Sequence, residues 1–99
     1  MVMFDLPTSS KAARISYRKF REFLLDDGYF MEQYSVYSRL ALGRDSLETH
    51  LQRIKANLPS AGTVTVFSFT DKQYSDRKVL IQSRKTTENQ QDSQLTLFF

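Results

Sequence analysis

The sequence predicts one small domain of the α+β class, because short apolar, strand-like segments occur together with two amphipathic helical segments. The chain has 99 residues, which is enough for a single hydrophobic core. Its eight phenylalanines and five tyrosines can fill that core without tryptophan. A domain of this size buries only about two-thirds of its unfolded surface, so dimerisation would be a natural way to bury more.

The N-terminal half predicts a strand, a helix and a second strand. Residues 1–4 are apolar, and Pro7 ends this first strand because proline has no amide donor. Residues 10–27 carry apolar side chains at helical spacing, and Gly28 is a typical residue after a helix end. Residues 29–40 alternate between apolar and polar side chains, which predicts one strand.

The C-terminal half predicts a second helix and two further strands. Residues 45–58 have helical periodicity, with Asp45 as the expected cap of this helix. Residues 63–70 are rich in β-branched and aromatic side chains and predict a third strand. Residues 71–76 are polar and turn-like, and residues 79–81 predict a short fourth strand.

Four strands and two helices are the elements of the ferredoxin-like βαββαβ arrangement, which we predict and in which two helices cover one face of an antiparallel sheet. We divide the chain into a domain at 1–82, a polar linker at 83–93 and a C-terminal apolar strand at 94–99. An apolar strand after a polar linker needs a surface on which to pack. It could form an extra strand on its own sheet or on the edge of a partner's sheet, and we expect it to join the sheet of a dimer partner. The expected interface residues are Leu95, Leu97 and Phe98.

Composition excludes several classes of protein and site. The absence of cysteine rules out disulfides and thiolate metal sites, and it fits the cytoplasm, where we expect the protein. No apolar run approaches the roughly 20 residues of a membrane span. There is no glycine-rich phosphate loop, and the single histidine, His50, lacks a second ligand at metal-binding spacing. A net charge of +3 is only a weak indication of a polyanionic partner.

Asp5 is the candidate catalytic and metal-binding residue, because it lies where an apolar strand opens into a loop. A partly dehydrated carboxylate in that place could bind Mg²⁺. One carboxylate cannot hold a catalytic metal alone, whereas two copies that meet across a dimer axis could share one ion. The alternative is that Asp5 caps the following helix or accepts hydrogen bonds from loop amides. The pattern alone leaves both interpretations open.

A row of basic residues on the first predicted helix is a candidate nucleic-acid contact. Its members follow one another at steps of three and four and so share one flank, which suits a series of phosphates. The row consists of Lys11, Arg14, Arg18 and Arg21. Arg39 and Arg44, which flank the second loop, could extend it. The alternative is an ordinary solvated helix face.

Aromatic side chains on the predicted strands allow a different binding mode, in which single-stranded bases stack on rings. The candidates are Tyr34 with Tyr37 and Phe67 with Phe69. The glycine-flanked aromatic signature of such binders is missing, so we expect these rings to pack in the core or in an interface.

Several stretches of the chain together resemble the CRISPR-associated protein two family, the smaller of the two general spacer-acquisition proteins. They are VMFDLP (2–7), YRKFREFL (17–24), GYFMEQYSVY (28–37) and TDKQY (70–74). The resemblance covers residues 1–82. The apolar ending is most similar to versions from type II systems.

The resemblance implies a ferredoxin-like homodimer with divalent-metal phosphodiesterase activity, in which the two Asp5 carboxylates face each other and share Mg²⁺. It also implies that the dimer bridges the larger integrase subunit of spacer acquisition and holds duplex DNA destined to become a spacer. We expect spacer acquisition to be the main function. One alternative is a Mg²⁺-dependent endonuclease that acts on single-stranded RNA or DNA, and a further one is a ferredoxin-like regulatory domain that binds a small molecule.

Overall fold

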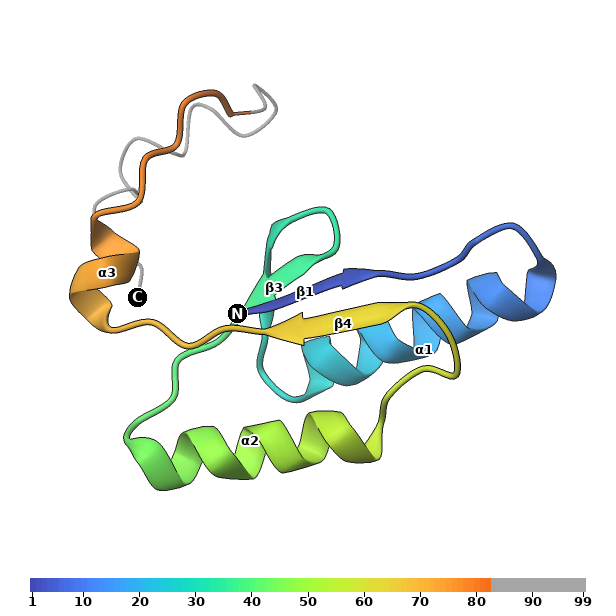
Figure 1. Ribbon diagram of the computed structural model, residues 1–99, viewed down its shortest axis with the longest axis horizontal. Helices are drawn as coiled ribbons and strands as arrows, with labels where there is room; N and C mark the ends of the chain where they lie inside the picture. Colours follow the sequence, from blue (N-terminus) through green and yellow to red (C-terminus); the bar gives the residue numbers. More distant parts are fainter. Residues whose placement is uncertain (83–99) are drawn as a thin grey trace. The chain divides into compact units, whose positions relative to one another are not determined.

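Four strands form one antiparallel sheet on which two helices pack (Figure 1). The computed structural model describes residues 1–82, which fall into a first unit, Met1–Phe67, and a second unit that begins at Ser68. The elements of the first unit are β1 (Val2–Asp5), α1 (Lys11–Asp26), β2 (Phe30–Gln33), β3 (Val36–Ser38), α2 (Arg44–Ala56) and β4 (Thr63–Val66). The spatial order β2-β3-β1-β4 is that of a ferredoxin-like fold, so the predicted fold class is confirmed.

The core lies between the two helices and one face of the sheet. Val2 and Phe4 of β1 are buried in one cluster with Phe20 of α1 and Ile54 of α2. Both helices therefore cover the same face of the sheet, as predicted (Figure 1). Side chains alternate along a strand, so the residues that follow Val2 and Phe4 in β1 point to the opposite face of the sheet. That face carries no helix of the first unit.

Helix α1 begins and ends close to the predicted positions. Ser10 is its N-cap, and the Ser10 side chain accepts a hydrogen bond from the Ala13 amide at 3.1 Å. The helix ends at Asp26, and Gly28 follows with a φ of 93°, a conformation that favours glycine. Local chemistry at both ends thus fixes α1, which is why the sequence pattern located it.

The prediction of one strand over residues 29–40 was wrong, because this segment is a hairpin. β2 and β3 pair antiparallel, with Phe30 opposite Ser38, and a turn at residues 34–35 joins them. Ser35 adopts a φ of 63°, which reverses the chain without a glycine. The hairpin supplies the two consecutive strands that the βαββαβ order requires.

Helix α2 begins earlier than predicted and without the expected cap. Its N-cap is Gly43, which has a φ of 93° and offers no side-chain hydrogen bond. Asp45 lies in the first turn, where the positive end of the helix dipole stabilises its negative charge. The helix ends at Ala56, and the predicted strand at 63–70 ends at Val66. None of the helices within residues 1–82 is long and apolar enough to cross a membrane.

The second unit corrects two further predictions. The turn expected at 71–76 is the short helix α3 (Asp71–Ser75), which Thr70 and Gln73 start with a capping box. The strand expected at 79–81 does not form within the described chain, and Leu80 there is 91% exposed. The predicted linker at 83–93 and strand at 94–99, with Leu95, Leu97 and Phe98, lie outside the described residues.

Candidate nucleic-acid interface and metal site

Asp5 ends β1 and lies on the face of the sheet that α1 and α2 leave uncovered. Its backbone pairs with Thr63 of β4, and its side chain is exposed. Within residues 1–82, no hydrogen bond or ion pair joins the Asp5 carboxylate to another side chain or amide. Ser10 caps α1, so Asp5 does not do so. The carboxylate is thus held in place by the strand and available to an external ligand.

Gly62 fixes the backbone beneath Asp5. It has a φ of 98°, and a Cβ at this position would lie 2.6 Å from the Asp5 carbonyl oxygen and 3.0 Å from the Leu6 Cα. Only glycine allows the chain entering β4 to pass this close to the end of β1. The position of Asp5 therefore depends on a residue far along the chain.

The donor set at Asp5 fits Mg²⁺ only if a second source of ligands is present. Within the described residues, no three histidine, aspartate or glutamate side chains are grouped so that they could hold a metal. Mg²⁺ in phosphate chemistry keeps several waters and uses one or two carboxylates together with phosphate oxygens. One exposed, unpartnered Asp5 from each of two chains would meet that requirement.

Apolar side chains share the uncovered face with Asp5. Met3 is two residues before Asp5 in β1, so both side chains point to the same face of the sheet. Val36 of β3 lies opposite Met3 and shares this face. Phe30 pairs with Ser38, two residues after Val36, and so lies on this face as well. Met3 is 42% exposed and Phe30 is 43% exposed. An apolar sheet face of this kind is typical of a surface that another protein covers.

The predicted basic row divides into exposed and internally bonded members. Lys11, Arg14 and Arg18 are exposed along α1. Arg14 donates to the Thr8 carbonyl at 3.2 Å, which steadies its guanidinium at the start of the helix. Arg21 is half-buried, and its Nε donates at 2.8 Å to the hydroxyl of the buried Tyr37. The row presented to solvent is therefore shorter than the sequence pattern indicates.

The two arginines that could extend the row also differ from each other. Arg39 is half-buried and donates to the backbone carbonyls of Leu40 and Asp27, while its guanidinium lies over the Tyr29 ring. Arg44 is exposed at the first turn of α2. Arg39 thus serves the fold, and Arg44 is the one of this pair that a phosphate could reach.

The candidate aromatic residues also separate by burial. Tyr37 is 1% exposed and belongs to the core, as predicted, whereas Tyr34 is 74% exposed at the turn between β2 and β3. Hydrogen bonding and charge from the neighbouring Tyr17 raise the pKa of the Tyr34 phenol, so it is neutral near pH 7. Phe67 and Phe69 are 39% and 50% exposed.

Sequence reasoning missed a second charged cluster, which joins the end of α1 to α2. The Asp27 carboxylate bonds His50 Nδ1 at 2.9 Å and the Arg53 guanidinium at 2.7 Å. Burial alone raises the pKa of Asp27, but the bonds to His50 and Arg53 outweigh burial and lower this pKa below its ordinary value. Residues 27 and 50 are far apart in the chain, so no local spacing could have revealed the pair.

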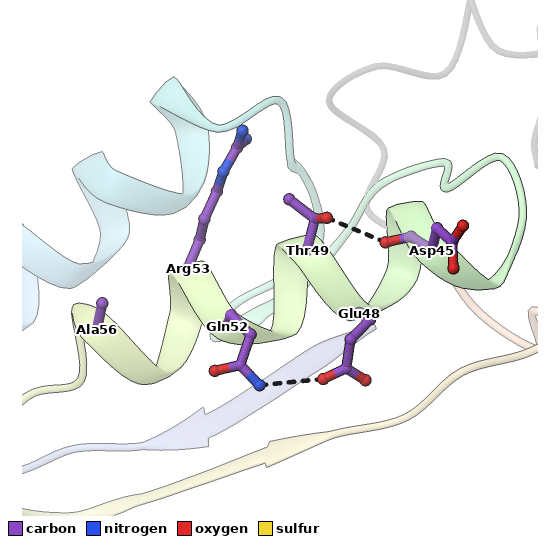
Figure 2. A pocket seen from close by; sticks show the side chains of 6 residues that line it. All are labelled: Asp45, Glu48, Thr49, Gln52, Arg53 and Ala56. Carbon is purple, nitrogen blue, oxygen red and sulfur yellow. Dashed lines mark hydrogen bonds between the residues drawn. The ribbon is translucent and has the colours of Figure 1, made fainter.

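Arg53 also lines a shallow depression along α2 (Figure 2). Figure 2 shows Arg53 extending away from the rest of the lining toward the neighbouring ribbon. Three of the other polar side chains form hydrogen bonds within α2. Gln52 donates to Glu48 at 3.0 Å, and Thr49 donates to the Asp45 carbonyl at 3.0 Å. These bonds run along one helix and bring no group of catalytic side chains together in the depression.

Comparison with known proteins gives a consistent result. Residues 1–77 match the family model described as CRISPR associated protein Cas2. A relative from Acidovorax ebreus, named CRISPR-associated endoribonuclease Cas2, is 52% identical over 82% of this chain and 79% of its own length. Relatives of the same name from Parvibaculum lavamentivorans and Streptococcus mutans are 42% and 40% identical. These two alignments span 99% and 96% of this chain, and 97% and 89% of the relatives.

The family match extends from β1 through α3, and so includes Asp5, the exposed part of the basic row and the β2–β3 turn. The resemblance that the sequence motifs indicated is thereby confirmed. The chain belongs to the CRISPR-associated protein Cas2 family.

Proposed function

We propose that this protein acts in CRISPR spacer acquisition as a homodimer that binds nucleic acid by its backbone and bridges integrase subunits. The observation that supports the binding role is the exposed basic flank of α1, formed by Lys11, Arg14 and Arg18. Within residues 1–82, no carboxylate forms an ion pair with any of the three. Their charge is therefore available to an external anion.

Backbone binding suits these residues better than recognition of sequence. Phosphates repeat regularly along a nucleic acid, and cations on successive turns of one helix can contact several of them. Phosphate contacts position a protein but carry no sequence information. A protein that receives DNA fragments of any sequence needs this kind of contact.

The salt dependence of binding tests this role. We expect the double variant Arg14→Ala/Arg18→Ala to lower the slope of log affinity against log salt by about two, with similar loss for unrelated DNA sequences. Lys55→Ala on α2 is the matched control, because it removes an exposed positive charge elsewhere and should change the slope much less. Unchanged affinity of the double variant for duplex DNA would contradict the proposal, as would an equal effect of the Lys55 variant.

A second proposed activity is metal-dependent cleavage of phosphodiester bonds at a pair of Asp5 residues. The exposed, unpartnered Asp5 carboxylate favours it, and so do the relatives named as endoribonucleases. We propose Mg²⁺ as the ion and single-stranded RNA as the first substrate to test. When bound there, Mg²⁺ would neutralise negative charge on the reacting phosphate. Asp5 would hold the ion, and the end of β1 would hold Asp5.

Asp5→Asn tests the cleavage activity separately from binding. We expect highly purified Asp5→Asn protein to lose the RNA cleavage that Mg²⁺ supports and EDTA abolishes, while its affinity for duplex DNA is unchanged. Asp26→Asn is the matched control, because it makes the same chemical change at an exposed carboxylate of α1. If the Asp5 variant cleaves as well as the wild type, Asp5 is not the metal ligand.

The proposed homodimer buries the uncovered sheet face. Met3 and Phe30 would leave solvent there, and Asp5 would approach its counterpart from the other chain. We expect Met3→Glu to shift the protein to monomers in analytical ultracentrifugation and to reduce cleavage together with dimerisation. We also expect deletion of residues 94–99 to weaken the dimer or its assembly with the integrase subunit. A full-strength dimer in both variants would contradict this arrangement.

A further inference from the structure

The turn between β2 and β3 holds an aromatic ring in solvent. Tyr34 is 74% exposed, more than any other aromatic side chain within residues 1–82. It precedes Ser35, whose φ of 63° allows the tight turn in which Tyr34 lies. A large ring in this position loses apolar burial, so its exposure requires an explanation beyond the packing of one chain.

Tyr34 is supported from one side by a fixed ring. The rings of Tyr34 and Tyr17 stack with centroids 6.0 Å apart and planes 19° from parallel. The Tyr17 hydroxyl lies 3.0 Å from the Ser35 Oγ, and the Tyr17 ring meets the buried Phe4 edge-on at 5.7 Å. These contacts fix Tyr17 between the core and the turn. Tyr34 is thereby restrained before any ligand arrives, which lowers the entropy cost of binding on its open side.

The turn that carries Tyr34 is linked to α1 and to β1. Its support, Tyr17, lies on α1 between Arg14 and Arg18, so the stacked pair shares a helix with the exposed basic row. The Phe4 amide donates to the Ser35 carbonyl at 3.0 Å, which joins the turn to the strand residue just before Asp5. A nucleotide at Tyr34 would therefore lie beside the helix that carries the exposed arginines and beside a turn that is bonded to β1.

We propose that Tyr34, supported by Tyr17, is a stacking platform for one unpaired base of a single-stranded nucleic acid. This inference rests on the proposed nucleic-acid role and specifies which form of nucleic acid the site prefers. Every base offers a flat π surface, so the platform accepts single strands of any sequence. Bases inside a duplex are stacked on each other and present only their edges, so they cannot stack on the Tyr34 ring.

The surrounding charges favour a nucleic acid over a protein as the occupant. The exposed side chains that flank Tyr17 on α1 include two arginines without a carboxylate partner in residues 1–82. A neutral phenol beside a helix with exposed cations suits a base whose phosphates bind those cations. Packing of Tyr34 against a protein partner is the competing possibility. Variants of Tyr34 distinguish base stacking from protein packing.

Tyr34→Ala and Tyr34→Phe form the test, because the first removes the ring and the second removes only the hydroxyl. We expect Tyr34→Ala to weaken binding of a single-stranded oligouridine or oligoadenine RNA about ten-fold or more, at fixed salt. Duplex binding should change less than about two-fold, and the salt slope should not change because no charge is lost. Tyr34→Phe should bind as the wild type does. Unfolding curves of both variants verify that the hairpin is intact.

An abasic oligonucleotide supplies the decisive control. It retains its phosphates but has no base to stack, so wild type and Tyr34→Ala should bind it equally. A selective loss of base-containing single strands supports the proposal. An equal loss for duplex, abasic and single-stranded ligands overturns it, and so does unchanged nucleic-acid binding accompanied by weaker dimerisation or integrase docking.

Failure of this inference can be told apart from failure of the proposed function. If Tyr34→Ala has no effect while Arg14→Ala/Arg18→Ala lowers the salt slope, backbone binding stands and the platform does not. If the wild type binds no nucleic acid, both proposals are wrong.

Discussion

Two carboxylates near opposite ends of α1 have opposite surroundings. Asp27, just after the helix, is nearly buried and bonded to His50 and Arg53. Asp5, before the helix, is exposed and has no side-chain partner within residues 1–82. Satisfying a buried charge stabilises a fold, whereas an exposed carboxylate that is bonded only by water can bind a ligand. The difference in surroundings distinguishes a structural cluster at Asp27 from a candidate functional residue at Asp5.

Among the substitutions that test this difference between Asp5 and Asp27, we expect the largest loss of stability from one at Gly62, which lies against the backbone of Asp5. We expect Gly62→Ala to lower the free energy of unfolding by about 3 kcal/mol, because a strained φ is combined with a contact against the β1 backbone. Gly43→Ala is the matched control. Gly43 has a similar φ of 93° but open space around its Cβ position, so its cost should be smaller. Urea unfolding of both variants measures the difference, and equal losses would show that the close contact is unimportant.

Removing the partnered carboxylate should have the next largest effect. We expect Asp27→Asn to destabilise the fold by about 2 kcal/mol, because it weakens charge-assisted bonds to a half-buried histidine. Arg53 is 54% exposed, so solvent screens its share of the loss. Asp26→Asn, one residue earlier and exposed, should change stability by less than about 0.5 kcal/mol. Equal losses in the two variants would contradict a structural role for the Asp27 cluster.

Acid should weaken the same cluster. The pKa of Asp27 is lower in the folded protein than its ordinary value of 3.8, so its stabilisation is complete above that value. As pH falls through the lowered pKa, the folded carboxyl also takes a proton and the advantage disappears. We therefore expect the stability difference between wild type and Asp27→Asn to narrow below about pH 4 in urea titrations at several pH values. A difference that stays constant there would argue against the ionised Asp27 as its source.

The smallest effect on stability should come from the other carboxylate. We expect Asp5→Asn to change the free energy of unfolding by less than about 0.5 kcal/mol, because no bond within the described chain is lost. A loss close to that of Asp27→Asn would show that Asp5 has a structural role. The same variant should abolish metal-dependent cleavage, so stability and activity diverge at Asp5.

Predictions from the sequence succeeded where local chemistry determines the structure. Ser10 caps the start of α1 and Gly28 follows its end, and both residue types have a known preference for these positions. The hairpin was missed because alternation continues through its turn, and Ser35 takes a positive φ without the usual glycine or asparagine. The capping box of Thr70 and Gln73 was visible in the sequence and was overlooked.

Contacts between distant residues were beyond such reasoning. Nothing in the spacing of Asp27 and His50 indicates that they meet, and the helical period of Arg21 does not reveal its bond to Tyr37. The exposed Tyr34 and the buried Tyr37 are three residues apart with the same side chain. Tertiary structure alone distinguishes them. Asp5 was identified by its place at a strand end and by family resemblance, and the structure adds that it lacks a partner within residues 1–82.

The pairing of β1 with β4 has a consequence for how the protein is made. Asp5 lies opposite Thr63, so the strand that carries the candidate catalytic residue is synthesised first and receives one of its two neighbours near the end of this unit. Pairing between such distant segments forms late in folding, after the cost of closing a long loop has been met. A nascent chain that has not yet released residue 63 from the ribosome leaves β1 as an open edge. We therefore expect Asp5 to reach its final position only after β4 has paired with β1.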